Sequence, residues 1–250
     1  KYKNEYIDIN YKIADFFSAK KITNITKKKF KIITALSVFY DSADPNQFIK
    51  DVNRILSNDG IFLLEFADLA SIVKYKMFDT ICHEHLEYYS TKVIDNLCKK
   101  NNLRIFDINA NDINGGSKQY LICHQKSKYK TNLRKIYKIL NSEKKLKLSE
   151  EKTFKKFIKT VNQSKNKLNK FLKKTNRQGK IVHGYGASTK GNVLLQYYKI
   201  NNKMIKYIAE RNKNKYGLYT PGTKIKIIPE SLSRFYNPDY YLVLPWHFKK

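Results

Sequence analysis

The stretch KIVHGYGASTKGNVLLQYYKI (180–200) decides the fold class of this chain. It begins with a short apolar strand, continues into the glycine-rich turn 184–191, and ends with the apolar spacing of a helix. Further apolar runs follow at 206–210, 225–228 and 240–246. A strand, a glycine turn, a helix and another strand in this order are typical of a Rossmann-like unit with parallel strands. The sequence therefore predicts an α/β fold.

The residues before this stretch predict a second, partial α/β unit. KIITAL (31–36) is typical of a buried strand, and Asp44-Pro45 is expected to begin a helix. A turn is expected at 57–60, followed by the strand IFLLEF (61–66).

A long irregular stretch, from Ala67 to Ser90, is expected next, and long loops in compact domains are usually functional. A helix at 91–102 is then followed by a hairpin of strands 103–109 and 117–124. Residues 131–176 have helical periodicity without Pro or Gly, which predicts one or two long connecting helices.

The net charge of +29 invites a nucleic-acid role, because clustered basic residues bind phosphate. Only six of the 50 basic residues are Arg, whereas planar recognition of phosphates and bases prefers Arg. The lysine excess is more typical of an overall compositional bias with a solvated lysine surface. Nucleic acid is therefore an unlikely partner, although the charge favours anionic substrates.

The cellular setting is expected to be a reducing cytoplasm. No apolar run approaches the roughly 20 residues that span a bilayer, and the first residues lack the apolar core of a signal peptide. Cys82, Cys98 and Cys123 are too few and too scattered for a disulfide framework. The chain begins at Lys1 without Met, so we expect a fragment of a longer protein.

The segment CHEHLEYYS (82–90) carries the strongest indication of chemistry. Histidine is the usual general base near neutral pH, and a neighbouring carboxylate can orient it. A zinc site is the weaker interpretation, because no second cluster at ligand spacing accompanies the segment, and no metal is expected in this chain. Surface histidines without a role are the other alternative.

Two further groups of residues are candidate ligand contacts. The turn 184–191 has glycines that let backbone approach a phosphate, and Lys190 strengthens that interpretation, although a purely structural turn is as probable on spacing alone. Asp15 and Phe16, expected at the carboxyl end of an extended strand at 11–14, and Ser37, at the carboxyl end of the strand 31–36, could line an adenosine. Core packing is the equally weighted alternative for this second group.

Five motifs in order, taken together, resemble the S-adenosylmethionine-dependent C-methyltransferases that act on nucleotide-linked keto-sugars. The resemblance covers nearly the whole chain. Its motifs are FDTICHEHLEYYS (78–90), Asn114–Ser117, Gly184–Ala187 with Lys190–Asn192, Tyr219–Thr223, and Leu244–Trp246. Cys82 stands where that family commonly has Tyr, so the assisting group or the substrate is expected to differ.

This resemblance implies a domain plan. Residues 1–130 would be the C-terminal part of a Rossmann-like S-adenosylmethionine-dependent methyltransferase domain, and 131–176 a helical connector. Residues 177–250 would be a second, incomplete Rossmann-like domain that binds the nucleotide sugar. The family's zinc-binding cysteines and first glycine-rich cofactor loop would lie before Lys1, so zinc is expected only upstream of this chain.

The resemblance also assigns roles to residues. His85 would be the general base that removes the proton beside the sugar ketone, Glu84 would position it, and Tyr88 or Tyr89 would help to stabilise the enolate. S-adenosylmethionine would be the cofactor. The other contacts would come from Asp15, Phe16 and Ser37 for the cofactor, and from Asn114, Gly115, Gly116, Ser117, Tyr185, Ser188, Lys190 and Asn192 for the nucleotide sugar.

Two rival functions stay open at this point. An RNA or DNA methyltransferase is favoured by the charge, but the lysine bias and the second nucleotide-type unit argue against it. A non-catalytic nucleotide-sugar-binding module is the other rival, and the intact His83-Glu84-His85 argues against that one. Neither the sugar, the methylated carbon nor the oligomeric state follows from the sequence.

Overall fold

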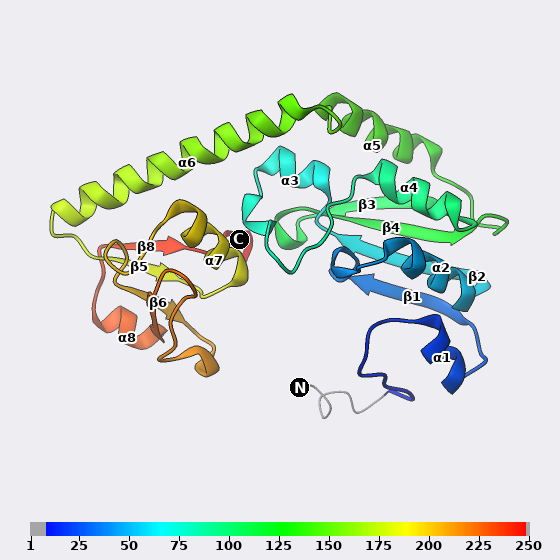
Figure 1. Cartoon of the computed structure of the whole chain (residues 1–250), viewed down its shortest axis with the longest axis horizontal. Coiled ribbons are helices and arrows are strands. Elements are labelled where there is room, and N and C mark those ends of the chain that lie inside the picture. The colour runs from blue at the N-terminus through cyan, green and yellow to red at the C-terminus, as the bar shows by residue number, and fades with distance from the viewer. Residues whose placement is uncertain (1–8, 249–250) are drawn as a thin grey trace. The chain divides into compact units, whose positions relative to one another are not determined.

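The computed structural model describes residues 9–248, and the chain divides into two compact units. Figure 1 shows the elements of both in chain order. The first unit comprises Lys1–Phe66, Leu86–Ala110 and Lys118–Ser142. The second comprises Ala67–His85, Asn111–Ser117 and Glu143–Lys250. Each unit therefore contains segments that are distant in sequence.

The first unit is built on a four-stranded mixed sheet with the order β1-β2-β4-β3. β1 and β2 are parallel, whereas β2 and β4 are antiparallel. Its elements are α1 (Ala19–Ile25), β1 (Phe30–Leu36), α2 (Pro45–Ile55), β2 (Leu56–Phe66), α4 (Thr91–Lys100), β3 (Leu103–Asn111), β4 (Ser117–His124) and most of α5 (Leu133–Leu146). β3 lies at the edge beside β4, which confirms that the two strands close one side of the sheet.

Local sequence explains where the helices of this unit begin. Asp44 caps α2 by accepting a 2.9 Å hydrogen bond from the Gln47 amide, and Pro45 occupies the first turn, where its missing N–H costs nothing. Ser90 caps α4 through the Val93 amide. The apolar faces of both helices are buried with the sheet in one core that includes Phe39, Phe62 and Tyr120.

The turn predicted at 57–60 is wrong. The structure continues β2 through these residues, and the pairing with β1 is irregular there: Phe30 pairs with Leu56, and Ile32 with Ile61. Five steps along β2 are matched by two along β1 here, so the polar run forms a bulge within the strand, and Gly60 allows the close approach that the bulge requires. A Cβ at Gly60 would lie 2.9 Å from the Phe30 carbonyl oxygen.

The stretch from Ala67 to Ser90 is less irregular than predicted. It contains α3 (Leu69–Tyr75) and the short 3-10 helix η2 (Phe78–Thr80). Asp68 caps α3, since its carboxylate accepts hydrogen bonds from the Ala70 and Ser71 amides. The helix has only seven residues, which is too short for apolar periodicity to reveal it.

The second unit contains a parallel sheet with the order β7-β6-β5-β8. β5 therefore lies between the strand that follows it in sequence and the last strand, as in a doubly wound nucleotide-binding half. The elements are α6 (Glu151–Arg177), β5 (Val182–Tyr185), α7 (Thr189–Tyr198), β6 (Tyr207–Glu210), β7 (Lys226–Pro229), α8 (Glu230–Phe235) and β8 (Tyr240–Val243). The predicted α/β fold class is confirmed.

The predicted long helices at 131–176 are confirmed as α5 and α6. Compactness places 67–85 and 111–117 in the second unit, although both precede the predicted connector. The predicted domain ranges 1–130, 131–176 and 177–250 describe function rather than compactness, and they stay a prediction.

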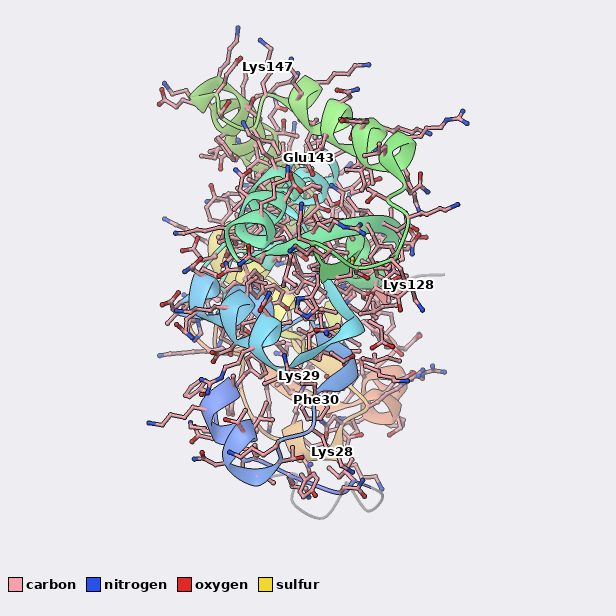
Figure 2. All side chains as sticks on the ribbon, turned by 90° about the vertical axis from the view of Figure 1, so that its right-hand side faces the viewer. Lys28, Lys29, Phe30, Lys128, Glu143 and Lys147 are labelled. Atoms are coloured by element: carbon pink, nitrogen blue, oxygen red, sulfur yellow. The ribbon has the colours of Figure 1, made fainter. Side chains whose placement is uncertain are left out.

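Lysine side chains cover much of the exposed surface. Lys147, in the turn between α5 and α6, and Lys28 and Lys29, before β1, are exposed (Figure 2). Over residues 9–248, none of the helices combines the length and the apolar character that crossing a bilayer requires.

Candidate functional site

The end of β8 is the meeting point of four of the sequence motifs in the second unit. Leu244, Pro245 and Trp246 each pack against a glycine from another motif. A Cβ would lie 2.8 Å from Leu244 Cβ if added at Gly191, 2.7 Å from Pro245 if added at Gly186, and 2.5 Å from the Trp246 ring if added at Gly115. Real Cβ atoms essentially never come this close, so these three positions require glycine. We call residues 244–246 the β8 hub.

The hub also holds the segment that precedes the histidines. The indole Nε1–H of Trp246 donates a 2.7 Å hydrogen bond to Oδ2 of Asp79, which is only 3% exposed. Asp79 lies in η2, where the neighbouring Phe78 ring stacks on Tyr198 of α7 with centroids 5.1 Å apart. A buried carboxylate needs such a donor, because burying an unpaired charge is costly. Residues 78–80 are therefore held against the other residues of the second unit.

Lys190 fixes the second inserted loop in the same way. Its ammonium donates a 2.6 Å hydrogen bond to the Asn114 carbonyl oxygen and lies 6.0 Å from the Trp246 ring centroid. Burial lowers the pKa of Lys190, and the negative charge of Asp79 partly offsets that effect. Asn114 adopts a left-handed backbone, which Asn tolerates better than most residues. The loop 111–117 and segment 78–80 thus share one partly buried cluster.

The segment 82–85 follows this cluster within the second unit. His83 and Glu84 are exposed, whereas Cys82 and His85 are half-buried. The backbone closes a turn in which the His85 amide donates to the Cys82 carbonyl at 3.3 Å. An imidazole in this setting is accessible to a ligand from solvent, which a general base requires.

Tyr88 and Tyr89 belong to the first unit. Tyr89 is 4% exposed and packs on Phe39 and Phe66, with ring centroids 4.9 Å and 5.9 Å apart. Burial raises the pKa of its phenol. Its hydroxyl is buried without a hydrogen-bond partner within residues 9–248. Tyr88 is half-buried.

A crevice of about 500 Å³ opens beside the glycine turn at the carboxyl ends of β5 and β6. This is the position where doubly wound sheets bind nucleotides. Its lining residues are Tyr185, Gly186, Ala187, Ser188, Ala209, Glu210, Arg211, Lys215 and Pro245. Tyr185 and Ser188 therefore lie together, while their contact with a nucleotide sugar stays a prediction, and Ser188 also caps α7 by accepting from the Gly191 amide at 3.0 Å.

Glu210 organises the crevice, and sequence reasoning missed it. Its carboxylate accepts hydrogen bonds from the backbone amides of Ala187, Arg211 and Asn212, at 2.8 to 2.9 Å. Burial raises the pKa of Glu210, but these three donors outweigh it, and the pKa lies below its ordinary value. An acid ending the strand after a glycine turn and helix is the pattern that could have revealed it.

Two cations also line the crevice. Lys215 donates to the Ala187 carbonyl at 2.7 Å, and its ammonium lies 3.8 Å from the Glu210 carboxylate. Arg211 Nε donates to Glu230 at 2.7 Å. The hydrogen bonds of Glu230 with Arg211 and Arg234 lower the pKa of that carboxyl to about 2. The crevice thus combines a glycine turn with two positive charges at its rim.

The other predicted substrate contacts lie around the hub or on α7. Gly116 packs against Tyr75, where a Cβ would lie 3.2 Å from the ring, and the Ser117 hydroxyl donates to the Ile113 carbonyl. Asn192 is half-buried on α7. Neither Lys190 nor Asn192 lines the crevice itself.

Comparison with known proteins now identifies the family. Residues 112–250, more than half of the chain, match the model of the C-methyltransferase C-terminal domain. The chain belongs to this C-methyltransferase family. The match contains the glycine turn, the crevice and the β8 hub, and it begins within the loop that Lys190 holds.

A curated relative extends the C-methyltransferase similarity beyond that domain. The chain is 27% identical over 218 residues to the C-methyltransferase NovU from Streptomyces niveus. The matched region covers 87% of this chain and 52% of NovU. The chain thus spans about half the length of this curated relative.

The solved structures that are similar to this chain each cover only part of it. One is a methyltransferase of Thermotoga maritima described as a possible histamine N-methyltransferase, with 15% identity, a TM-score of 0.34, and 40% of this chain and 57% of that chain covered. Another is magnesium protoporphyrin IX methyltransferase from Synechocystis PCC 6803, with 14% identity, a TM-score of 0.31, and 39% and 46% covered.

The residues predicted to contact the methyl donor lie in the first unit. The Phe16 ring is 89% exposed, and the Asp15 carboxylate pairs with Lys21 at 2.5 Å. Residues 11–14 are not in a strand, so the expectation that Asp15 follows one is wrong. Ser37, at the end of β1, has φ 55° and donates its amide to the Glu65 carbonyl. The role of these three residues in binding S-adenosylmethionine therefore stays a prediction.

Between residues 9 and 248, His, Cys, Asp and Glu side chains do not assemble into a group of three or more that could hold a metal ion.

Proposed function

We propose that this chain is the C-terminal part of a methyltransferase that transfers the methyl group of S-adenosylmethionine to the carbon beside the ketone of a nucleotide-linked keto-sugar. The family match and the similarity to NovU support the reaction class. The substrate class rests on the sequence resemblance and on the nucleotide-type crevice in the second unit.

The observation that carries the proposal is that the proposed base and the crevice belong to the same compact unit. His85, the Lys190-bound loop and the crevice beside the glycine turn all belong to the second unit. An enzyme that removes a proton from a sugar must hold the sugar's nucleotide handle and its base on one rigid frame. This unit supplies both kinds of group.

Each crevice residue receives a role in this proposal. Arg211 and Lys215 place positive charge beside the glycine turn, where a diphosphate would bind, and Tyr185 and Ser188 would contact the same group. Lys190 has three donors and uses one on Asn114, so it retains capacity for a phosphate oxygen. Asn192 stays a predicted contact.

The proton step follows from the residues of segment 82–85. The His85 imidazole takes the proton from the carbon beside the ketone, the C–H electron pair becomes the enolate, and the proton stays on His85 as imidazolium. Glu84, the preceding residue, keeps the positioning role that the sequence resemblance implies. Of the two tyrosines considered for contact with the enolate, we propose Tyr88, because the Tyr89 hydroxyl is buried in the core of the first unit.

S-adenosylmethionine, when bound, supplies the electrophilic methyl group. Asp15, Phe16 and Ser37 are the residues of this chain proposed to hold its adenosine. The proposed location is the cytoplasm, and the three free cysteines are consistent with a reducing compartment.

Methyl transfer to a panel of acceptors tests the proposal. The protein is incubated with S-adenosylmethionine carrying a carbon-13 methyl group and with dTDP-, UDP- and GDP-linked 4-keto-hexoses, and carbon NMR follows a new methyl signal on a quaternary or tertiary sugar carbon. A labelled C-methyl sugar supports the proposal. Label appearing in RNA or DNA supplied in the same assay instead would favour the nucleic-acid rival.

The binding-module rival predicts a third outcome. It expects nucleotide-sugar binding with no methyl transfer and no proton exchange at the sugar. Binding is therefore measured calorimetrically on the same panel, so that loss of chemistry is separated from loss of substrate.

A further inference from the structure

Asp79 and Trp246 lie 167 residues apart, yet they form one hydrogen bond, in which the carboxylate is buried and the indole is partly exposed. Trp246 also closes over Gly115, and Lys190 reaches the Asn114 carbonyl beside it. All of these residues belong to the second unit, although the segments of Asp79 and Asn114 are connected at both ends to residues of the first.

We propose that Asp79 and Trp246 are positioning residues that hold the base-bearing segment 78–85 on the nucleotide-sugar unit, so that proton abstraction depends on that unit and not on the methyl donor. The inference rests on the proposed function, since it takes His85 as the base. It adds an order of events: the substrate can lose its proton before the methyl donor is engaged.

The geometry supports a tether at two levels. Asp79 is six residues before His85, and η2 locks its backbone through the Thr80 amide, which donates to Met77, and the Ile81 amide, which donates to Phe78. The carboxylate is nearly fully buried, so the indole donor satisfies a group that is costly to leave unpaired. The stacking of Phe78 on Tyr198 adds an apolar anchor from α7.

The second tie fixes the neighbouring loop. Lys190 holds the Asn114 carbonyl, and the left-handed backbone of Asn114 and Gly115 presents that carbonyl to α7. Because Trp246 contacts the loop through Gly115 and segment 78–80 through Asp79, one side chain joins both insertions. Removing its N–H donor should therefore loosen segment 78–85 without altering the crevice, whose lining does not include Trp246.

Amide hydrogen exchange read by mass spectrometry tests the tether without any ligand. Trp246→Phe removes the N–H donor together with the outer indole edge that meets Gly115, and we expect exchange of peptide 76–86 to rise about tenfold. Asp79→Ala should match it. Asp79→Asn retains an acceptor for the indole and should stay within about threefold of the parent chain. Phe235→Leu, at an exposed ring of the same unit, is the control and should change nothing.

A kinetic readout separates positioning from simple loss of folded protein. In D₂O, exchange of the sugar proton catalysed by Trp246→Phe should fall about tenfold in kcat, while KM for the nucleotide sugar changes less than about threefold. Asp79→Asn should restore most of the rate. The parent chain should exchange at the same rate with and without S-adenosylmethionine.

Each result decides one point. Unchanged protection of 76–86 in Trp246→Phe, or a rise in KM equal to the fall in kcat, would overturn the tether. An exchange rate that requires S-adenosylmethionine would overturn the proposed order of events. If His85→Ala exchanges the sugar proton as fast as the parent chain, the proposed function fails instead, and the amide measurement still judges the tether by itself.

Discussion

The Trp246 indole and the Asp79 carboxylate, joined by a 2.7 Å hydrogen bond, link the last strand of the chain to the segment that leads into His83-Glu84-His85. This bond explains why motifs far apart in sequence belong together. Leu244, Pro245 and Trp246 each pack so closely against a glycine that no Cβ fits there. These glycines lie in α7, in the turn after β5 and in the loop 111–117, respectively. A change in any of these positions disturbs the same cluster.

Gly115→Ala tests the close approach directly. Its φ of +91° is unfavourable for any L side chain, and the new Cβ would meet the Trp246 ring, so we expect a loss of about 3 kcal/mol in the unfolding free energy of the second unit. Trp246 is the single tryptophan of the sequence, so urea denaturation followed by its fluorescence reports this unit.

Gly217→Ala is the matched control for this prediction. Gly217 has a φ of +79° but nothing within 4 Å of its added Cβ, so only backbone strain of about 1 kcal/mol is expected. Equal losses in the two variants would show that the contact between Gly115 and Trp246 contributes nothing.

Lys215→Met tests the crevice as a phosphate site. Lys215 lines the crevice beside the glycine turn, and losing one charged contact of about 1 to 1.5 kcal/mol should weaken binding of UDP or dTDP about fivefold to tenfold. Titration calorimetry at low and at high salt measures the affinity. Lys213→Met, an exposed lysine two residues earlier, should shift it less than about twofold. Equal effects of both variants would indicate only general attraction by the lysine surface.

His183 gives the second unit a pH dependence. It is 1% exposed, its Nδ1 lies 2.8 Å from the Ser233 hydroxyl, and burial lowers its pKa below the ordinary 6.5. The unfolded chain therefore binds a proton more readily than the folded chain, so stability falls as the pH drops below about 6.5. The urea midpoint read from Trp246 fluorescence should decrease between pH 7.5 and pH 5.

His183→Gln should flatten this dependence, and His83→Gln, at an exposed site, should leave it unchanged. Burial and the charge of Lys190 lower the pKa of His247 in the same direction, so some slope should remain in His183→Gln. An identical slope in the parent chain and His183→Gln would contradict the prediction.

Elements with long apolar runs or clear helix caps could be predicted from the sequence. β1, β5 and α7 follow apolar patterns, and the Asp44-Pro45 start of α2 is a local signal that tertiary packing did not override. α3 and α8 were missed, because helices of seven and six residues show too little periodicity. The turn expected at 57–60 lies within β2 instead, where the register with β1 shifts and Asn58-Asp59-Gly60 form a bulge that local turn preference does not distinguish from a turn.

The site was predictable only where its residues lie in one motif. Tyr185 and Ser188 follow directly from the glycine turn, and both line the crevice. Asp79 and Trp246 could be quoted as parts of motifs but not paired, because a bond across 167 residues depends on how the chain folds back. Glu210 carried a positional signal at the end of β6, whereas its three backbone donors are visible only in the structure.

Proton exchange at the sugar tests the central assignment most directly. Nucleotide-linked 4-keto-hexoses are followed by proton NMR in D₂O with the parent chain, His85→Ala and His83→Ala, each checked for folding by circular dichroism. The account predicts exchange at the carbon beside the ketone with the parent chain and His83→Ala, and a fall of about 100-fold or more with His85→Ala. Exchange that survives in His85→Ala, or none with the parent chain on any sugar, would contradict His85 as the base.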